Sequence, residues 1–173
     1  IQRSRGLGDV YKRQKQEYAT LPLSLQFLTL ALLLIPVSLL MGKFGRKKIF
    51  ILGVLSSLLG TLIVAFSIFD KNFMYFIVGS IFIGVSQATQ QFYRYAAADN
   101  VPDNFKSKAL SYVLAGGLIA AILGPELSKI SYTFLTEHIY LATYLIAGTV
   151  QILNLFVLAF LNIPKPKKNI NIK

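Results

Sequence analysis

The chain has 173 residues, of which 54% are hydrophobic and 14% charged, and its formal net charge is +11. This composition is typical of an integral membrane protein and argues against an ordinary soluble domain. The sequence contains no cysteine and one histidine, His138. Disulfides, thiolate chemistry and multi-histidine metal centres are therefore excluded, and we expect no metal and no cofactor.

The first fourteen residues, IQRSRGLGDVYKRQ, carry four basic residues and one acidic residue directly ahead of apolar sequence. The stretch GLGDVYKRQ resembles a translated sequencing adapter that occurs at the ends of unrelated environmental sequences. We therefore interpret residues 1–14 as a leader that is not native to the protein. The fold prediction excludes it, as it would exclude an engineered scar.

Five long apolar runs follow this leader. A helix needs roughly 20 apolar residues to cross a hydrocarbon core of about 30 Å. The sequence predicts such helices at about residues 21–41, 49–69, 73–95, 109–131 and 139–163. Soluble helices average only about 11 to 12 residues, and a secretory signal has one short apolar run. The predicted fold class is all-α, a polytopic helical membrane protein with five transmembrane helices in a membrane domain of residues 15–163.

Basic residues are distributed unevenly over the connections. Eleven follow the first, third and fifth spans, namely Lys43, Arg46, Lys47, Lys48, Arg94, Lys106, Lys108, Lys165, Lys167, Lys168 and Lys173, against Lys71 and Lys129 on the other side. Short basic loops stay in the cytoplasm. We therefore expect a multi-pass protein of the cell membrane whose residues 164–173 are cytoplasmic and begin a linker. The basic leader would then lie on the wrong side, which favours excluding it.

This positive charge could also be read as a nucleic-acid patch. Nucleic-acid binders, however, interleave basic and aromatic residues on a soluble face. Loop charge that sets topology contacts the lipid bilayer instead, so we expect no nucleic-acid partner.

The connection after the first span, SLLMGKFGRKKIF, contains a recognisable pattern. It resembles the signature loop between the second and third helices of the major facilitator superfamily. Gly45, Arg46 and Lys47 match that signature, and Lys43 replaces its first arginine. Gly42 stands where the family has an aspartate that helps to lock the two halves of the carrier, and glycine has no carboxylate. The resemblance implies a cytoplasmic gate loop of Lys43, Gly45, Arg46 and Lys47, in which Gly45 permits the tight turn.

The stretch after the third span resembles a second signature of that family. RYAAADNVPDNFKSKALS is similar to its loop between the fourth and fifth helices, with Arg94, Asp99, Pro102 and Lys106 in the matching places. The resemblance adds Asp99 to the gate loop residues.

The fourth span contains AGGLIAAILGPELSK, which resembles an eroded form of the family's fifth-helix signature, with Gly124 and Pro125 matching. Gly116, Ala120 and Gly124 recur every four residues and form one small-residue face, for which close contact with another helix is the expected use. Pro125 removes one helical hydrogen bond and permits a kink. A gating role and a packing role for this proline are both open.

Polar residues inside a span are expensive and therefore indicate candidate sites. Gln87, Gln90, Gln91 and Arg94 fall at positions i, i+3, i+4 and i+7 of the third span and share one face. They predict a wall of a substrate cavity that faces a polar or anionic solute. Alternatively, Arg94 reaches the headgroups and the glutamines bond to neighbouring helices. Glu126 could titrate during transport or pair with Lys129.

The resemblance covers nearly all of the chain after residue 14. It implies helices two to six of the six-helix N-terminal half of a twelve-helix carrier, although helices eight to twelve are also possible. The implied function is secondary active transport of an unknown small-molecule substrate by alternating access. The expected partners are the lipid bilayer and the missing helix one and C-terminal half of the same protein, without which the fragment would be inactive.

Other classes of protein remain as alternatives. The chain could be a five-helix membrane scaffold or a half-carrier that dimerises. A membrane enzyme is not expected, because the acidic residues are scattered over both sides and no nucleophile, base and orienting partner converge.

Overall fold

The computed structural model describes residues 18, 20–99, 101–131, 139–161 and 163. These residues contain helices and no strand, and five of the helices are long and apolar enough to cross a membrane. The predicted all-α class and the five-span pattern are therefore confirmed. The leader at residues 1–14, His138 and the linker at residues 164–173 lie outside the described residues.

The first, second and fourth long helices extend past the predicted spans, whereas the third and fifth end at Gln90 and Phe160, before the predicted ends at residues 95 and 163. The long helices are α2 (Leu21–Phe44), α3 (Arg46–Asp70), α4 (Phe73–Gln90), α6 (Lys106–Ser131) and α7 (Ile139–Phe160), with a short helix α5 (Tyr93–Asp99) and a 3₁₀ turn η2 (Asp103–Phe105) between α4 and α6. Lysine and arginine side chains can reach the headgroup region from the last turn of a helix. The helices therefore include basic residues that lie just outside the predicted spans, such as Lys43 in α2 and Lys106 in α6.

Gly45 is the single residue between α2 and α3. Its φ of 88° lies in the left-handed half of conformational space, where glycine is favoured because it has no Cβ. Its N–H donates to the carbonyl oxygen of Met41 at 3.0 Å, which closes the end of α2. This geometry agrees with the tight turn predicted at Gly45.

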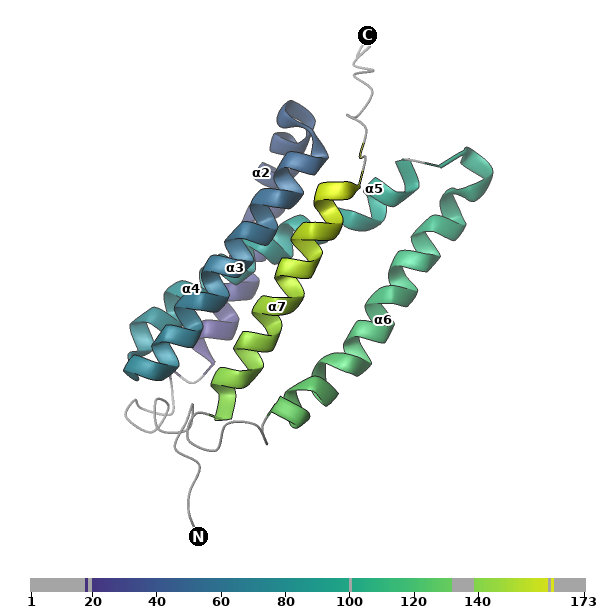
Figure 1. Ribbon diagram of the computed structural model, residues 1–173. Coiled ribbons are helices and arrows are strands. Elements are labelled where there is room, and N and C mark those ends of the chain that lie inside the picture. Colours follow the sequence, from purple (N-terminus) through teal and green to yellow (C-terminus); the bar gives the residue numbers. More distant parts are fainter. Residues whose placement is uncertain (1–17, 19, 100, 132–138, 162, 164–173) are drawn as a thin grey trace.

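Helices α2, α3, α4 and α7 form one packed group (Figure 1). Helix α4 packs against both α2 and α3, and α3 also packs against α7. The buried core of this group contains Val37, Met41, Ile49, Phe50, Val54, Ala88, Ala96 and Leu158. These residues come from α2, α3, α4, α5 and α7, so the core joins helices that lie far apart in the sequence.

Glycines bring the backbones of this group close together. A Cβ added to Gly60 would lie 2.7 Å from the carbonyl oxygen of Gly79, and one added to Gly79 would lie 2.8 Å from that of Gly60. Gly84 approaches α2 in the same way, since its Cβ would lie 2.6 Å from the carbonyl oxygen of Gln26. Such contacts are the usual means of packing helices in lipid, where apolar side chains gain little by leaving the hydrocarbon.

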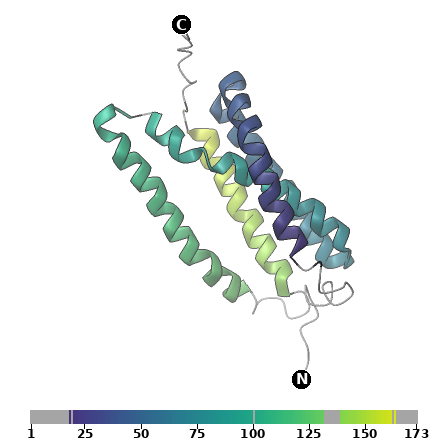
Figure 2. The same ribbon diagram turned by 180° about the vertical axis from the view of Figure 1, so that it is seen from behind.

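Helix α6 stands apart from the packed group in both views (Figures 1 and 2). Ser131 is its one buried residue, and none of the candidate membrane window in this helix is buried. Cβ atoms added to Gly116 or Gly124 would meet nothing within 4 Å, and Ala120 is exposed. The close helix contact predicted along Gly116, Ala120 and Gly124 is thus not made within the described chain. It stays a prediction for a segment outside it.

Candidate functional site

The two ends of the group of helices differ in net charge. One end holds the α2–α3 turn, α5 and the beginning of α6, and it carries Lys43, Arg46, Lys47, Lys48, Arg94, Lys106 and Lys108 with the acids Asp99 and Asp103 (Figures 1 and 2). We call it the basic end. The opposite end carries Asp70, Lys71, Glu126 and Lys129, which balance one another in charge.

Arg46 and Asp99 meet at the basic end. The Arg46 Nη2 atom, at the first residue of α3, lies 2.5 Å from the Asp99 Oδ2 atom, at the last residue of α5. The Arg46 side chain is 19% exposed and that of Asp99 53% exposed, so the arginine is the more buried partner. The ion pair ties the α2–α3 turn to α5. The resemblance to the family signatures predicts both residues at the gate loop but does not predict their ion pair.

Lys47 connects the same turn to α7. Its Nζ donates a hydrogen bond of 2.8 Å to the carbonyl oxygen of Ala159, near the end of α7. The last carbonyl groups of a helix lack intrahelical partners and carry the negative end of its dipole, so a lysine is well placed there. One turn further along α3, the ring of Phe50 packs edge-to-face on Tyr93 with centroids 4.6 Å apart. The beginning of α3 therefore holds both α5 and α7.

Lys43 differs from the other gate loop residues. Its Nζ lies 5.4 Å from the ring centroid of the adjacent Phe44, and its side chain is exposed. Gly42, at the position of the family's aspartate, has open space around it. The structure thus gives Arg46 and Lys47 bonds to other helices and leaves Lys43 at the surface.

Replacing Lys47 with methionine should lower the free energy of unfolding by about 1 kcal/mol, because the last carbonyls of α7 lose a charged donor. Lys48→Met is the matched control, since Lys48 is the exposed neighbour and makes no hydrogen bond to another helix in the described structure. Thermal unfolding in detergent, followed by circular dichroism, measures both. Equal losses in the two variants would show that Lys47 acts only through its charge.

The predicted polar stripe is interrupted. Helix α4 ends at Gln90, Gln91 and Phe92 form a turn, and α5 begins at Tyr93. The Phe92 N–H donates to Thr89, three residues back, instead of continuing the four-residue ladder. The span predicted at residues 73–95 lies within one candidate membrane segment, Phe73–Asp99, but Gln91 and Phe92 form a turn inside it. The face shared by Gln87, Gln90 and Arg94 is therefore not that of one regular helix.

The four predicted cavity residues have different environments. Gln90 Nε2 donates to Ser86 Oγ at 3.1 Å, and Gln91 is exposed. Arg94 places its guanidinium 4.9 Å from the ring centroid of Tyr95. Gln87 Oε1 and Arg94 Nε are buried without a hydrogen-bond partner among the described residues. Buried polar atoms are nearly always paired in a complete structure, so Gln87 and Arg94 are the stronger candidates for contact with something outside this chain.

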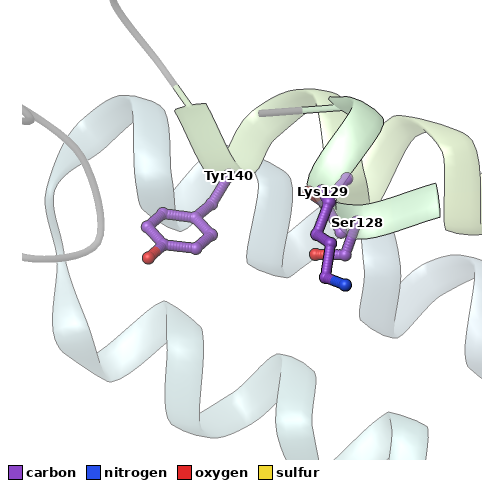
Figure 3. Close-up of a pocket in the computed structure, with 4 residues that line it drawn as sticks. Ser128, Lys129 and Tyr140 are labelled. Atoms are coloured by element: carbon purple, nitrogen blue, oxygen red, sulfur yellow. The ribbon is translucent and has the colours of Figure 1, made fainter. Parts of the chain in front are cut away.

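A pocket of about 250 Å³ lies at the opposite end, between α6 and α7. Ser128, Lys129, Tyr140 and Thr143 line it, and Figure 3 shows Tyr140 on one side and Ser128 and Lys129 on the other. Lys129 donates to Glu126 at 2.6 Å, so the pairing that was one of two readings for Glu126 is the one observed. None of the predicted cavity residues lines this pocket. The part of the chain that the structure describes also contains no cluster of three or more residues able to hold a metal ion.

The sequence was also compared with known proteins. Residues 14–173 match the family described as Major Facilitator Superfamily. The riboflavin transporter RfnT of Brucella anthropi is 36% identical over 152 residues, which is 88% of this chain and 38% of that protein. The chain therefore spans well under half the length of this relative. No solved structure matches it.

Proposed function

The chain belongs to the major facilitator superfamily, and from this premise we propose that it forms most of one half of a secondary carrier that works by alternating access. Family and relative indicate membrane transport of a small molecule by a carrier, not an enzyme. The observation that carries the mechanism is the linkage of α3 to α5 by Arg46 and to α7 by Lys47. Helices joined in this way at one end can rock as one body.

The proposed orientation follows from the charge difference between the ends. We place the basic end in the cytoplasm, because lysine and arginine in short connections are retained there. The carrier is then a multi-pass protein of the cell membrane, with the end of α7 and residues 164–173 on the cytoplasmic side.

The open face of α6 supports a further helix in the intact carrier. Carriers of this type contain inverted repeats of three helices, so α2 and α3 correspond to α6 and α7. Helix α4 packs against both α2 and α3. Its counterpart, helix one, would pack against α6 and α7 and cover Gly116, Ala120 and Gly124. The relative's greater length leaves room for this helix and for the C-terminal half.

We propose a flavin-like heteroaromatic substrate, following the relative's name. The Gln87 amide offers one acceptor and two donor hydrogens, and its Oε1 is buried without a partner. An isoalloxazine ring presents an imide N–H beside carbonyl oxygens, which matches such an amide. Arg94 and Tyr95 provide a cation and an aromatic face on the next helix. Gln90 and Gln91 remain secondary candidates for the same wall.

Replacing Gln87 with leucine in the full-length carrier should raise the KM for riboflavin uptake about tenfold and leave the maximal rate nearly unchanged, since one hydrogen bond to the substrate is lost. Uptake of labelled riboflavin into cells or proteoliposomes measures this. Gln151→Leu is the matched control. Gln151 is a half-buried glutamine on α7, and its Oε1 atom already accepts a hydrogen bond from Asn154 Nδ2 at 3.5 Å.

The outcomes separate the parts of this proposal. An unchanged KM in Gln87→Leu would remove Gln87 from the cavity. Unchanged uptake in both Arg94→Lys and Arg94→Gln would make Arg94 an anchor to the headgroups. Absence of riboflavin uptake by the unmodified full-length carrier would overturn the substrate and leave the carrier class standing, to be tested with other solutes.

A further inference from the structure

Three basic residues at the basic end lie beside aromatic rings. Lys43 Nζ is 5.4 Å from the centroid of Phe44, Lys108 Nζ is 4.9 Å from that of Phe105, and Arg94 Cζ is 4.9 Å from that of Tyr95. The three rings are 47%, 46% and 46% exposed, in the order Phe44, Phe105, Tyr95. No such pair occurs at the described part of the opposite end.

Several cations at this end lack a carboxylate partner. Arg46 pairs with Asp99, and Lys106 pairs with Asp103 at 2.6 Å. Lys43, Lys48 and Lys108 form no ion pair within the described ranges and are exposed. Gly42 provides no acid beside Lys43. The end therefore keeps a positive charge that its own side chains do not neutralise.

Exposed apolar or aromatic side chains lie one helical turn from two of these cations, Lys43 and Lys108. Leu39 lies one turn before Lys43 and Tyr112 one turn after Lys108, and both are 71% exposed. A soluble phosphate would leave these side chains in water, whereas a phospholipid covers them with its acyl chains and brings its phosphate to the cations. Exposed aromatic rings are enriched at the same headgroup depth.

We propose that the basic end binds anionic phospholipid headgroups, with Lys43 beside Phe44 and Lys108 beside Phe105 as its two principal contacts. In the described chain these pairs of a cation and an aromatic ring occur at the basic end alone. This agrees with contact to one leaflet that is rich in anionic lipid, which attracts basic residues near its surface. This interaction is independent of the transported substrate.

The test measures which lipid the full chain retains. Protein immobilised on an affinity resin is equilibrated with mixed micelles of equal phosphatidylglycerol and phosphatidylcholine and washed, and the retained lipids are quantified by mass spectrometry. We expect phosphatidylglycerol to be enriched. Each lysine removed should lower this enrichment about fivefold, so Lys43→Gln loses about fivefold and Lys43→Gln/Lys108→Gln about 25-fold. Lys43→Arg should retain it.

Lys71→Gln is the matched control, since Lys71 is an exposed lysine at the opposite end, and it should leave the enrichment unchanged. Raising the salt from about 0.1 M to about 1 M should weaken binding by the wild-type protein, because the Debye length falls from about 10 Å to about 3 Å. Equal retention of the two lipids, an equal loss in Lys71→Gln, or complete displacement of phosphatidylglycerol by soluble glycerol 3-phosphate would each overturn the proposal. Thermal unfolding confirms that each variant is folded.

Discussion

Replacing Gly60 with valine should destabilise the helix bundle by about 3 kcal/mol, the upper part of the range for overpacking, because the new side chain meets backbone atoms. The Cβ alone would lie 2.7 Å from the Gly79 carbonyl oxygen and 3.0 Å from the Ile83 nitrogen. Neither atom belongs to a side chain that can rotate away, so α3 and α4 must separate. Unfolding by sodium dodecyl sulfate in mixed micelles, followed by circular dichroism, measures the change in free energy.

The control for this prediction is Gly42→Val. Gly42 also lies within a long helix, but nothing lies within 4 Å of its added Cβ, so the change should stay within about 0.5 kcal/mol. Gly60→Ala should fall between the two valine variants. If Gly60→Val and Gly42→Val cost the same, close approach of α3 and α4 is not what stabilises the bundle.

Breaking the Arg46–Asp99 ion pair should produce unequal losses in its two partners. Asp99→Asn leaves the more buried Arg46 guanidinium without a carboxylate, and we expect a loss of about 2 kcal/mol. Arg46→Gln leaves the half-exposed Asp99 in contact with solvent, and we expect a loss of about 1 kcal/mol. Uptake by the full-length carrier should fall in both variants, because α3 and α5 are no longer joined at the gate loop.

A double-mutant cycle with the exchanged pair, Arg46→Asp and Asp99→Arg, separates the ion pair from other effects. The exchanged pair should recover part of the stability and uptake that either single change removes. Asp103→Asn is the control. The Asp103 side chain is 94% exposed, and its ion pair with Lys106 joins two residues that are only three positions apart. This substitution should leave stability nearly unchanged, because an ion pair in full contact with water contributes little. Additive losses across the cycle would show that Arg46 and Asp99 act separately.

The membrane architecture was predictable because it depends on local features. Each apolar run is long enough to cross the hydrocarbon core, and the number of long helices follows from the number of runs. The turn at Gly45 was predictable for the same reason, since its conformation needs a residue without a Cβ. The site was partly predictable. Arg46 and Asp99 were both expected at the gate loop, but their pairing requires the position of α5.

The remaining features depend on contacts between distant segments. The break after Gln90 interrupts the helix, and residues 90–92 contain no proline and no charge to indicate it. The bond from Lys47 to Ala159 joins residues 112 positions apart. The hydrogen bond between Ser131 and Thr143 joins α6 to α7, and neither residue belongs to a recognisable motif. For the same reason, the exposure of Gly116 and Gly124 could not be read from their spacing.

The order in which these helices pack has a consequence for synthesis. Helices α2, α3 and α4 are consecutive in the chain and pack on one another, so they can assemble in the bilayer while later helices are still being translated. Helix α6 has no neighbour along most of its length within the described chain. Helix one, the partner proposed for its small-residue face, precedes α2 in the chain and would already lie in the bilayer when α6 is synthesised. Helix α6 would therefore meet membrane proteases and chaperones mainly in a chain whose helix one is absent or misplaced.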